Sequence, residues 1–159
     1  MKIGEDAAFT YPCLLAADSL AYVDGCLYHY RNNAQSMTAA FDPHLTETIF
    51  IPLDILRTYF DTDKRALFAQ YQMYAAYLLQ LWVRNQASLD CDLDRKRMRQ
   101  SCARVCQNQE LRALLASVPG ALPRQVAVAV RAVQQQKPGQ LYLLIKAWNL
   151  YYKLRNGRA

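Results

Sequence analysis

The segment from residue 64 to residue 86 limits the possible folds most, because it is long, apolar and strongly periodic. Large apolar residues recur along it at the spacing of one helix face. They are Leu67, Phe68, Tyr71, Tyr74, Ala75, Leu78, Leu79 and Trp82. The pattern predicts a helix that must be covered by apolar neighbours, and it favours a mainly α protein.

The segments around it also follow helical spacing. We expect helices over residues 45–60, with a kink at Pro52, and over 93–107, 109–117 and 141–155. Residues 126–133 alternate like a strand, but their alanine content and the glutamines after them favour a helix. These segments predict a helical bundle over residues 43–159.

Residues 1–42 follow a different pattern. Residues 5–17 read as a helix whose first turn carries Glu5 and Asp6. Two apolar runs within residues 20–31 flank the turn Asp24-Gly25 and predict a β-hairpin. The expected fold is therefore mainly α, a helical bundle with one short β-hairpin near the N-terminus, divided near residue 42.

The charges are unevenly distributed along the chain. Residues 1–60 carry three basic and seven acidic side chains, whereas residues 61–159 carry sixteen basic and six acidic ones. A basic unit can face nucleic acid, an anionic membrane or phosphorylated substrates, or it can simply have solvated helix faces. No nucleic-acid-binding motif accompanies the charge, so we expect no nucleic-acid partner.

The cysteines argue against both disulfides and a metal. The five are Cys13, Cys26, Cys91, Cys102 and Cys106, an odd number without a CxxC pair. Cys102 and Cys106 are four residues apart but lack a nearby histidine, so we expect no metal site. With no signal-peptide core and no membrane-length apolar run, the sequence favours a reduced, cytoplasmic chain.

The acidic pair Glu5-Asp6 allows two interpretations. Acids in the first turn of a helix stabilise it by about 0.3–1 kcal/mol through the helix dipole. A carboxylate held rigidly at a helix mouth can also serve as a general base. The hairpin that follows would bring His29 and Arg31 back towards this end of the helix.

The residues from Lys2 to Thr38 resemble the last part of the catalytic domain of bacterial family-2 glycosyltransferases. Four pieces match in order: the acidic pair in Gly4-Glu5-Asp6, the strand Ala21–Asp24, the strand Leu27–Arg31 that ends in Tyr-x-Tyr-Arg, and the loop Asn32–Thr38. The helical remainder is similar to the C-terminal extensions of these enzymes in pattern only.

The resemblance implies an inverting transfer of a sugar from a nucleotide sugar to a glycan or lipid-linked acceptor. Asp6 would deprotonate the acceptor hydroxyl, and Glu5 would orient the site. Tyr28, His29 and Arg31 would bind substrate, with the last two near the donor diphosphate.

The family's donor-binding half lies upstream of this motif, with an Asp-x-Asp that holds Mg²⁺ or Mn²⁺. No Asp-x-Asp precedes Glu5, and the later pair Asp90 and Asp92 falls in a segment that reads as a turn and helix cap. We therefore expect a C-terminal piece that holds no cofactor and is inactive alone. Its exposed apolar surface would favour a homo-oligomer.

The alternative is a non-enzymatic helical interaction module. In residues 141–155, one face carries Leu141, Leu144, Ile145, Trp148 and Tyr152 and suits a core or a dimer seam. A second face carries Tyr142, Lys146, Asn149 and Lys153, which would suit contact with phosphate head groups. This alternative predicts either dimerisation or contact with the inner face of a membrane.

Overall fold

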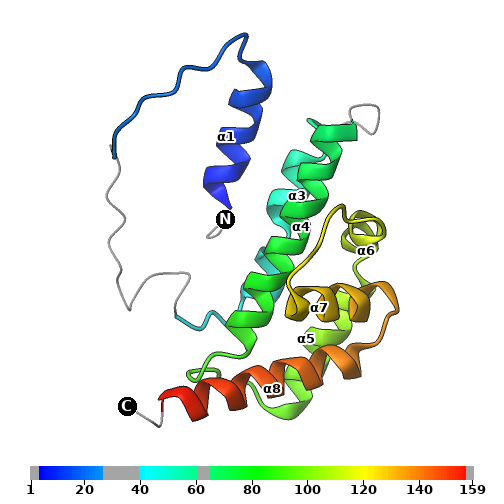
Figure 1. Ribbon diagram of the computed structural model, residues 1–159. Helices are drawn as coiled ribbons and strands as arrows, with labels where there is room; N and C mark the ends of the chain where they lie inside the picture. The colour runs from blue at the N-terminus through cyan, green and yellow to red at the C-terminus, as the bar shows by residue number, and fades with distance from the viewer. Residues whose placement is uncertain (1–3, 27–39, 61–64, 157–159) are drawn as a thin grey trace.

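The computed structural model describes residues 4–26, 40–60 and 65–156. Helices follow one another along these ranges as α1 Glu5–Ala16, α2 Leu45–Thr48, α3 Ile51–Leu56, α4 Arg65–Gln86, α5 Arg95–Gln107, α6 Gln109–Leu115, α7 Arg124–Gln134 and α8 Pro138–Asn156 (Figure 1). The described residues contain no strand. The mainly α class is confirmed.

Helix α4 runs through the middle of the bundle, as its periodicity predicts. Leu78, Leu79 and Trp82 are completely buried. Helices α2 and α3 pack against α4, and so do α6, α7 and α8 (Figure 1). Since apolar side chains are covered on several sides of α4, this helix is the centre of the hydrophobic core.

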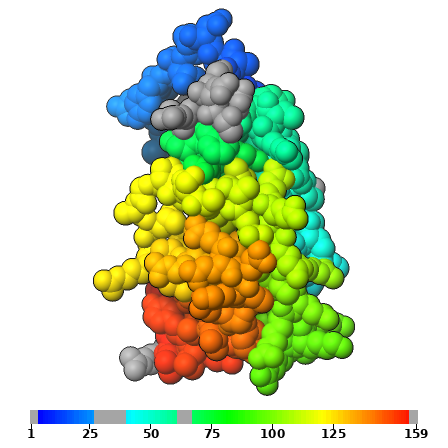
Figure 2. All heavy atoms as spheres, turned by 90° about the vertical axis from the view of Figure 1, so that its right-hand side faces the viewer, coloured from blue at the N-terminus to red at the C-terminus, as the bar shows by residue number. Residues whose placement is uncertain are grey.

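Helices α5, α7 and α8 pack together at the end of the molecule away from α1 (Figures 1 and 2). The buried face of α5 is the predicted one: Met98, Cys102, Val105 and Cys106. Residues 126–133 lie within α7, so the helical interpretation of that segment is confirmed. Asp94 is the N-cap of α5 and accepts a hydrogen bond from the Arg97 backbone N–H at 2.8 Å.

The predicted helix over 45–60 is two helices. Helix α2 ends at Thr48, and α3 starts again at Ile51 with Pro52 in its first turn. Proline lacks the N–H that a continuous helix would need here, but it fits a first turn, where that N–H has no partner. One buried face continues across the two helices, because Leu45, Ile49 and Leu53 are all buried in the core.

The predicted β-hairpin is not present in the described residues. Residues 20–24, its first strand, form no strand, and Leu20 and Tyr22 are exposed by 74% and 89%. The second strand falls outside the described residues. A strand needs a hydrogen-bonded partner and a covered apolar face, and an isolated two-stranded hairpin is marginal even when both strands pair.

Candidate functional site

The predicted helix mouth forms at the start of α1. Gly4 is the residue before the helix, with φ 87° and ψ 11°, and Glu5 and Asp6 occupy the first turn with exposed side chains. The Ala7 backbone N–H donates to Asp6 Oδ1 at 2.8 Å. The carboxylates therefore sit where the helix dipole favours negative charge, and solvent can reach them.

Gly4 presses this mouth against the helical bundle. A β-carbon on Gly4 would lie 2.5 Å from Tyr74 Oη and 2.7 Å from Pro52 Cγ. Its positive φ lies in the left-handed region that side-chain-bearing residues rarely adopt. The position thus requires glycine for two reasons, and the close approach places the acidic pair beside α3 and α4.

Tyr11 makes the second contact between α1 and the bundle. Its ring centroid lies 5.7 Å from that of Phe60 and 5.9 Å from that of Tyr74, both in edge-on arrangements. No residue of α1 is fully buried. The docking of α1 therefore depends on a few aromatic and glycine contacts, and these join residues on both sides of the boundary predicted near residue 42.

Tyr74 is a bundle residue with an unusual hydroxyl next to the acidic pair. Its hydroxyl is buried and has no hydrogen-bond partner among the described residues. Burial raises the pKa of Tyr74 far above the usual range, and the negative charge of Asp6 raises it further. Tyr74 is therefore a neutral hydroxyl beside the acidic pair, and periodicity had placed it simply in a core stripe.

The structure does not describe the other site residues predicted from the sequence. Tyr28, His29 and Arg31 lie outside the described residues. Within residues 4–26, 40–60 and 65–156, no group of three His, Cys, Asp or Glu side chains is arranged to hold a metal ion. The acidic pair is thus the part of the predicted site that the structure positions.

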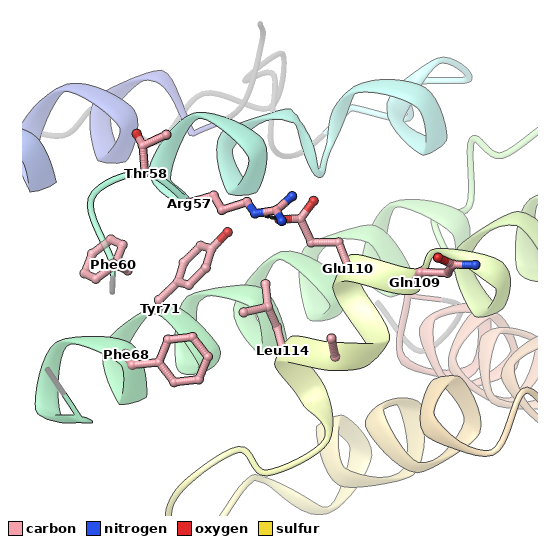
Figure 3. A pocket seen from close by; sticks show the side chains of 9 residues that line it. Arg57, Thr58, Phe60, Phe68, Tyr71, Gln109, Glu110 and Leu114 are labelled. Atoms are coloured by element: carbon pink, nitrogen blue, oxygen red, sulfur yellow. Dashed lines mark ion pairs between the residues drawn. The ribbon is translucent and has the colours of Figure 1, made fainter. Parts of the chain in front are cut away.

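A pocket of about 640 Å³ lies between the end of α3, the start of α4 and α6 (Figure 3). Arg57 Nε and Glu110 Oε1 form an ion pair at its rim, 3.8 Å apart. Partial burial and a hydrogen bond with Asp54 raise the pKa of Glu110. The rings of Phe60 and Tyr71 beneath the rim stack on each other and are buried.

Three separate segments build this pocket, so no sequence pattern could have predicted it. The buried rings offer no open face to a ligand, and the rim charges neutralise each other. The pocket shows no arrangement of nucleophile and base. We therefore take the helix mouth, and not this pocket, as the candidate site.

Comparison of the chain with protein-family models, with curated proteins and with solved structures found no match. Among the described helices, none has the length and apolar character needed to cross a membrane.

We expect Gly4→Ala to weaken the docking of α1. The added methyl group meets Tyr74 and Pro52, and the left-handed backbone costs about 1–2 kcal/mol for a residue with a β-carbon. Urea unfolding should show this loss of stability. Gly25→Ala is the matched control, because no atom lies within 4 Å of its β-carbon position. Equal stability of the two variants would contradict the close approach.

Tyr71 and Tyr74 should respond in opposite ways to replacement by Phe. Tyr71 donates a hydrogen bond to the Leu53 carbonyl at 2.6 Å, so Tyr71→Phe should lower the free energy of unfolding by about 0.5–1.5 kcal/mol. Tyr74→Phe removes a buried hydroxyl without a partner, so stability at pH 7 should stay equal or rise.

The same pair predicts the alkaline behaviour. Burial raises the pKa of both tyrosines, so the folded protein keeps two protons that the unfolded chain loses near pH 10. Stability should therefore be complete below about pH 10 and fall above it. Tyr74→Phe should make this fall shallower when the free energy of unfolding is measured in urea at increasing pH. An unchanged dependence on pH would contradict a raised pKa for Tyr74.

Proposed function

We propose that the chain is the C-terminal part of an inverting glycosyltransferase that acts on a nucleotide sugar and a glycan or lipid-linked acceptor. The observation that supports this most is the helix mouth. Gly4 anchors it to the bundle by a contact that leaves no room for a side chain, while Glu5 and Asp6 remain exposed. Such an arrangement offers an accessible carboxylate on a rigid mount.

The chemistry assigned to Asp6 is proton removal. In an inverting transfer, the acceptor oxygen attacks the anomeric carbon as the bond to the nucleotide diphosphate breaks. The acceptor proton passes to the Asp6 carboxylate, and the leaving group takes the bonding electrons. Glu5 would orient an acceptor hydroxyl, Tyr28 would bind substrate, and His29 and Arg31 would lie near the donor diphosphate.

In this proposal, metal assistance belongs to the part of the enzyme that binds the donor. The Mg²⁺ or Mn²⁺ and the nucleotide sugar would be bound by a donor half encoded upstream. The genomic frame before the Met1 codon should then continue into a strand–helix pattern with an Asp-x-Asp. A stop codon in that frame, just upstream, would contradict a fragment.

The role of Asp6 can be tested in the longer enzyme. Asp6→Asn should reduce transfer by about 10²–10⁴-fold, because general base catalysis contributes that much, while nucleotide-sugar binding persists. Asp18→Asn is the matched control, since Asp18 is exposed beyond the other end of α1. Full activity of Asp6→Asn would remove Asp6 as the base.

The second candidate function is an interaction module, and exposed apolar surface favours it. Large apolar side chains lie uncovered on α1 and the segment after it; they are Phe9, Leu14, Leu20, Tyr22 and Val23. Patches of this kind are commonly covered by self-association or by another domain.

We therefore expect the isolated chain to form a homodimer or a larger oligomer in solution through this N-terminal surface. Light scattering at several concentrations would measure it. Leu20→Gln with Tyr22→Gln should shift the population towards monomer, since both side chains are mostly exposed and burying them supplies the driving force. A wild-type chain that stays monomeric at every concentration would refute this expectation.

A further inference from the structure

Helix α8 carries apolar side chains on two opposite faces. Leu141 and Ile145 are buried in the bundle, and Trp148 and Tyr152 pack partly against it. At about 100° per residue, the side opposite to these holds another apolar row. We call it the outer α8 face; it consists of Leu143, Ala147, Leu150 and Leu154.

The outer α8 face is open to solvent. Leu143, Leu150 and Leu154 are exposed by 66%, 57% and 57%. With Ala147 between the first two, the spacing of four, three and four residues keeps these side chains in one row along the helix. A helix that is apolar on both sides is usually buried or lies at a membrane surface. We therefore expect a binding partner to cover this row.

The surroundings of this face are basic. Lys146 and Lys153 are exposed and lie along one edge of the row. Residues 111–159 contain eight basic side chains and no acidic one. In the neighbouring α5, five basic residues outnumber the three acids of the turn before it.

One contact brings cations from both helices together. The Tyr142 ring has the Arg99 guanidinium carbon 5.3 Å from its centroid and Lys146 Nζ 5.7 Å from it. Arg99 belongs to α5 and Lys146 to α8, so positive charge is gathered where the two helices meet. A negatively charged surface would relieve this repulsion.

The structure corrects the lipid-facing surface expected from the sequence. Asn149 does not face outwards; its side-chain amide donates to the carbonyls of Ala87 and Ser88, at 3.2 Å each. Tyr142 is half-buried beneath Arg99 and Lys146. Only the lysines of that predicted surface remain available, and they border the outer α8 face.

We propose that the outer α8 face docks parallel to an anionic lipid bilayer. Leu143, Leu150 and Leu154 would enter the boundary between head groups and acyl chains, and Lys146 and Lys153 would reach lipid phosphates. The charge of α8 fits this partner, because that helix contains no acid. This docking does not depend on the glycosyltransferase proposal.

A second copy of the chain is a poorer occupant of this face. Pairing two outer α8 faces would set Lys146 and Lys153 against the same lysines, without an acid on α8 to compensate. The row is also about 17 Å long and about 10 Å wide. That is far below the roughly 800 Å² per partner of a stable interface.

Vesicle co-sedimentation of the full chain tests the proposal. We expect binding to phosphatidylcholine vesicles that contain phosphatidylserine, little binding to phosphatidylcholine alone, and release by salt. Leu143→Gln with Leu150→Gln should weaken binding by about tenfold or more, because two apolar side chains no longer insert. Lys146→Glu with Lys153→Glu should weaken it comparably.

Matched controls separate this surface from general charge and stickiness. Val128→Gln removes an exposed apolar side chain on α7, and Arg124→Glu reverses an exposed charge on the same helix; both variants should bind as the wild type does. Circular dichroism should show that every variant keeps its helices, since the changed side chains are exposed.

Two results would overturn the proposal. One is equal binding of the wild type to neutral and anionic vesicles, or to neither. The other is a Leu143/Leu150 variant that binds vesicles normally but becomes monomeric in light scattering, which would make the outer α8 face a seam between copies.

Discussion

The burial of α4 is the constraint on which the rest of the structure depends. Three of its buried polar side chains find partners on neighbouring helices, because a buried donor without a partner costs free energy. Trp82 Nε1–H donates to Thr46 Oγ1 at 3.0 Å, and the Tyr71 hydroxyl donates to the Leu53 carbonyl. Gln72 Nε2 donates to the Leu114 carbonyl at 3.0 Å. Apolar burial supplies the stability, and these bonds join α2, α3 and α6 to α4.

Helical periodicity predicted the bundle because the apolar residues that recur along each helix mark the face that neighbouring helices bury. Met98 and Ile145 lie in the core where their spacing placed them. The same reasoning failed for residues 20–24, whose alternating apolar residues indicate a strand but stay exposed. An alternating pattern shows that a strand is possible, but pairing needs a second segment. A kink at Pro52 was expected, whereas the structure ends α2 at Thr48 and begins α3 at Ile51, with Pro52 in the first turn of α3.

The candidate site was predictable only where it is local in sequence. Glu5 and Asp6 occupy the helix mouth that their own neighbours specify. The contacts that anchor this mouth join Gly4 to Pro52 and Tyr74, residues that no pattern in one sequence links. Helical periodicity placed Tyr74 in the core stripe. Nothing in the sequence indicated that its hydroxyl would also lie beside the acidic pair. The sequence did not predict the pocket beside Glu110 either, because its lining comes from three separate segments of the chain.

The uneven charge of the sequence becomes a polarity of the folded chain. Gly4 meets α4 at Tyr74, whereas Asn149 of α8 meets the end of α4 at Ala87, which is about 20 Å further along that helix. This is more than twice the Debye length of about 8 Å at physiological salt. An anionic surface at the outer α8 face would therefore leave the field at the Glu5-Asp6 pair largely unchanged. The proposed docking and the proposed proton transfer can share one small bundle, because α4 separates the two surfaces.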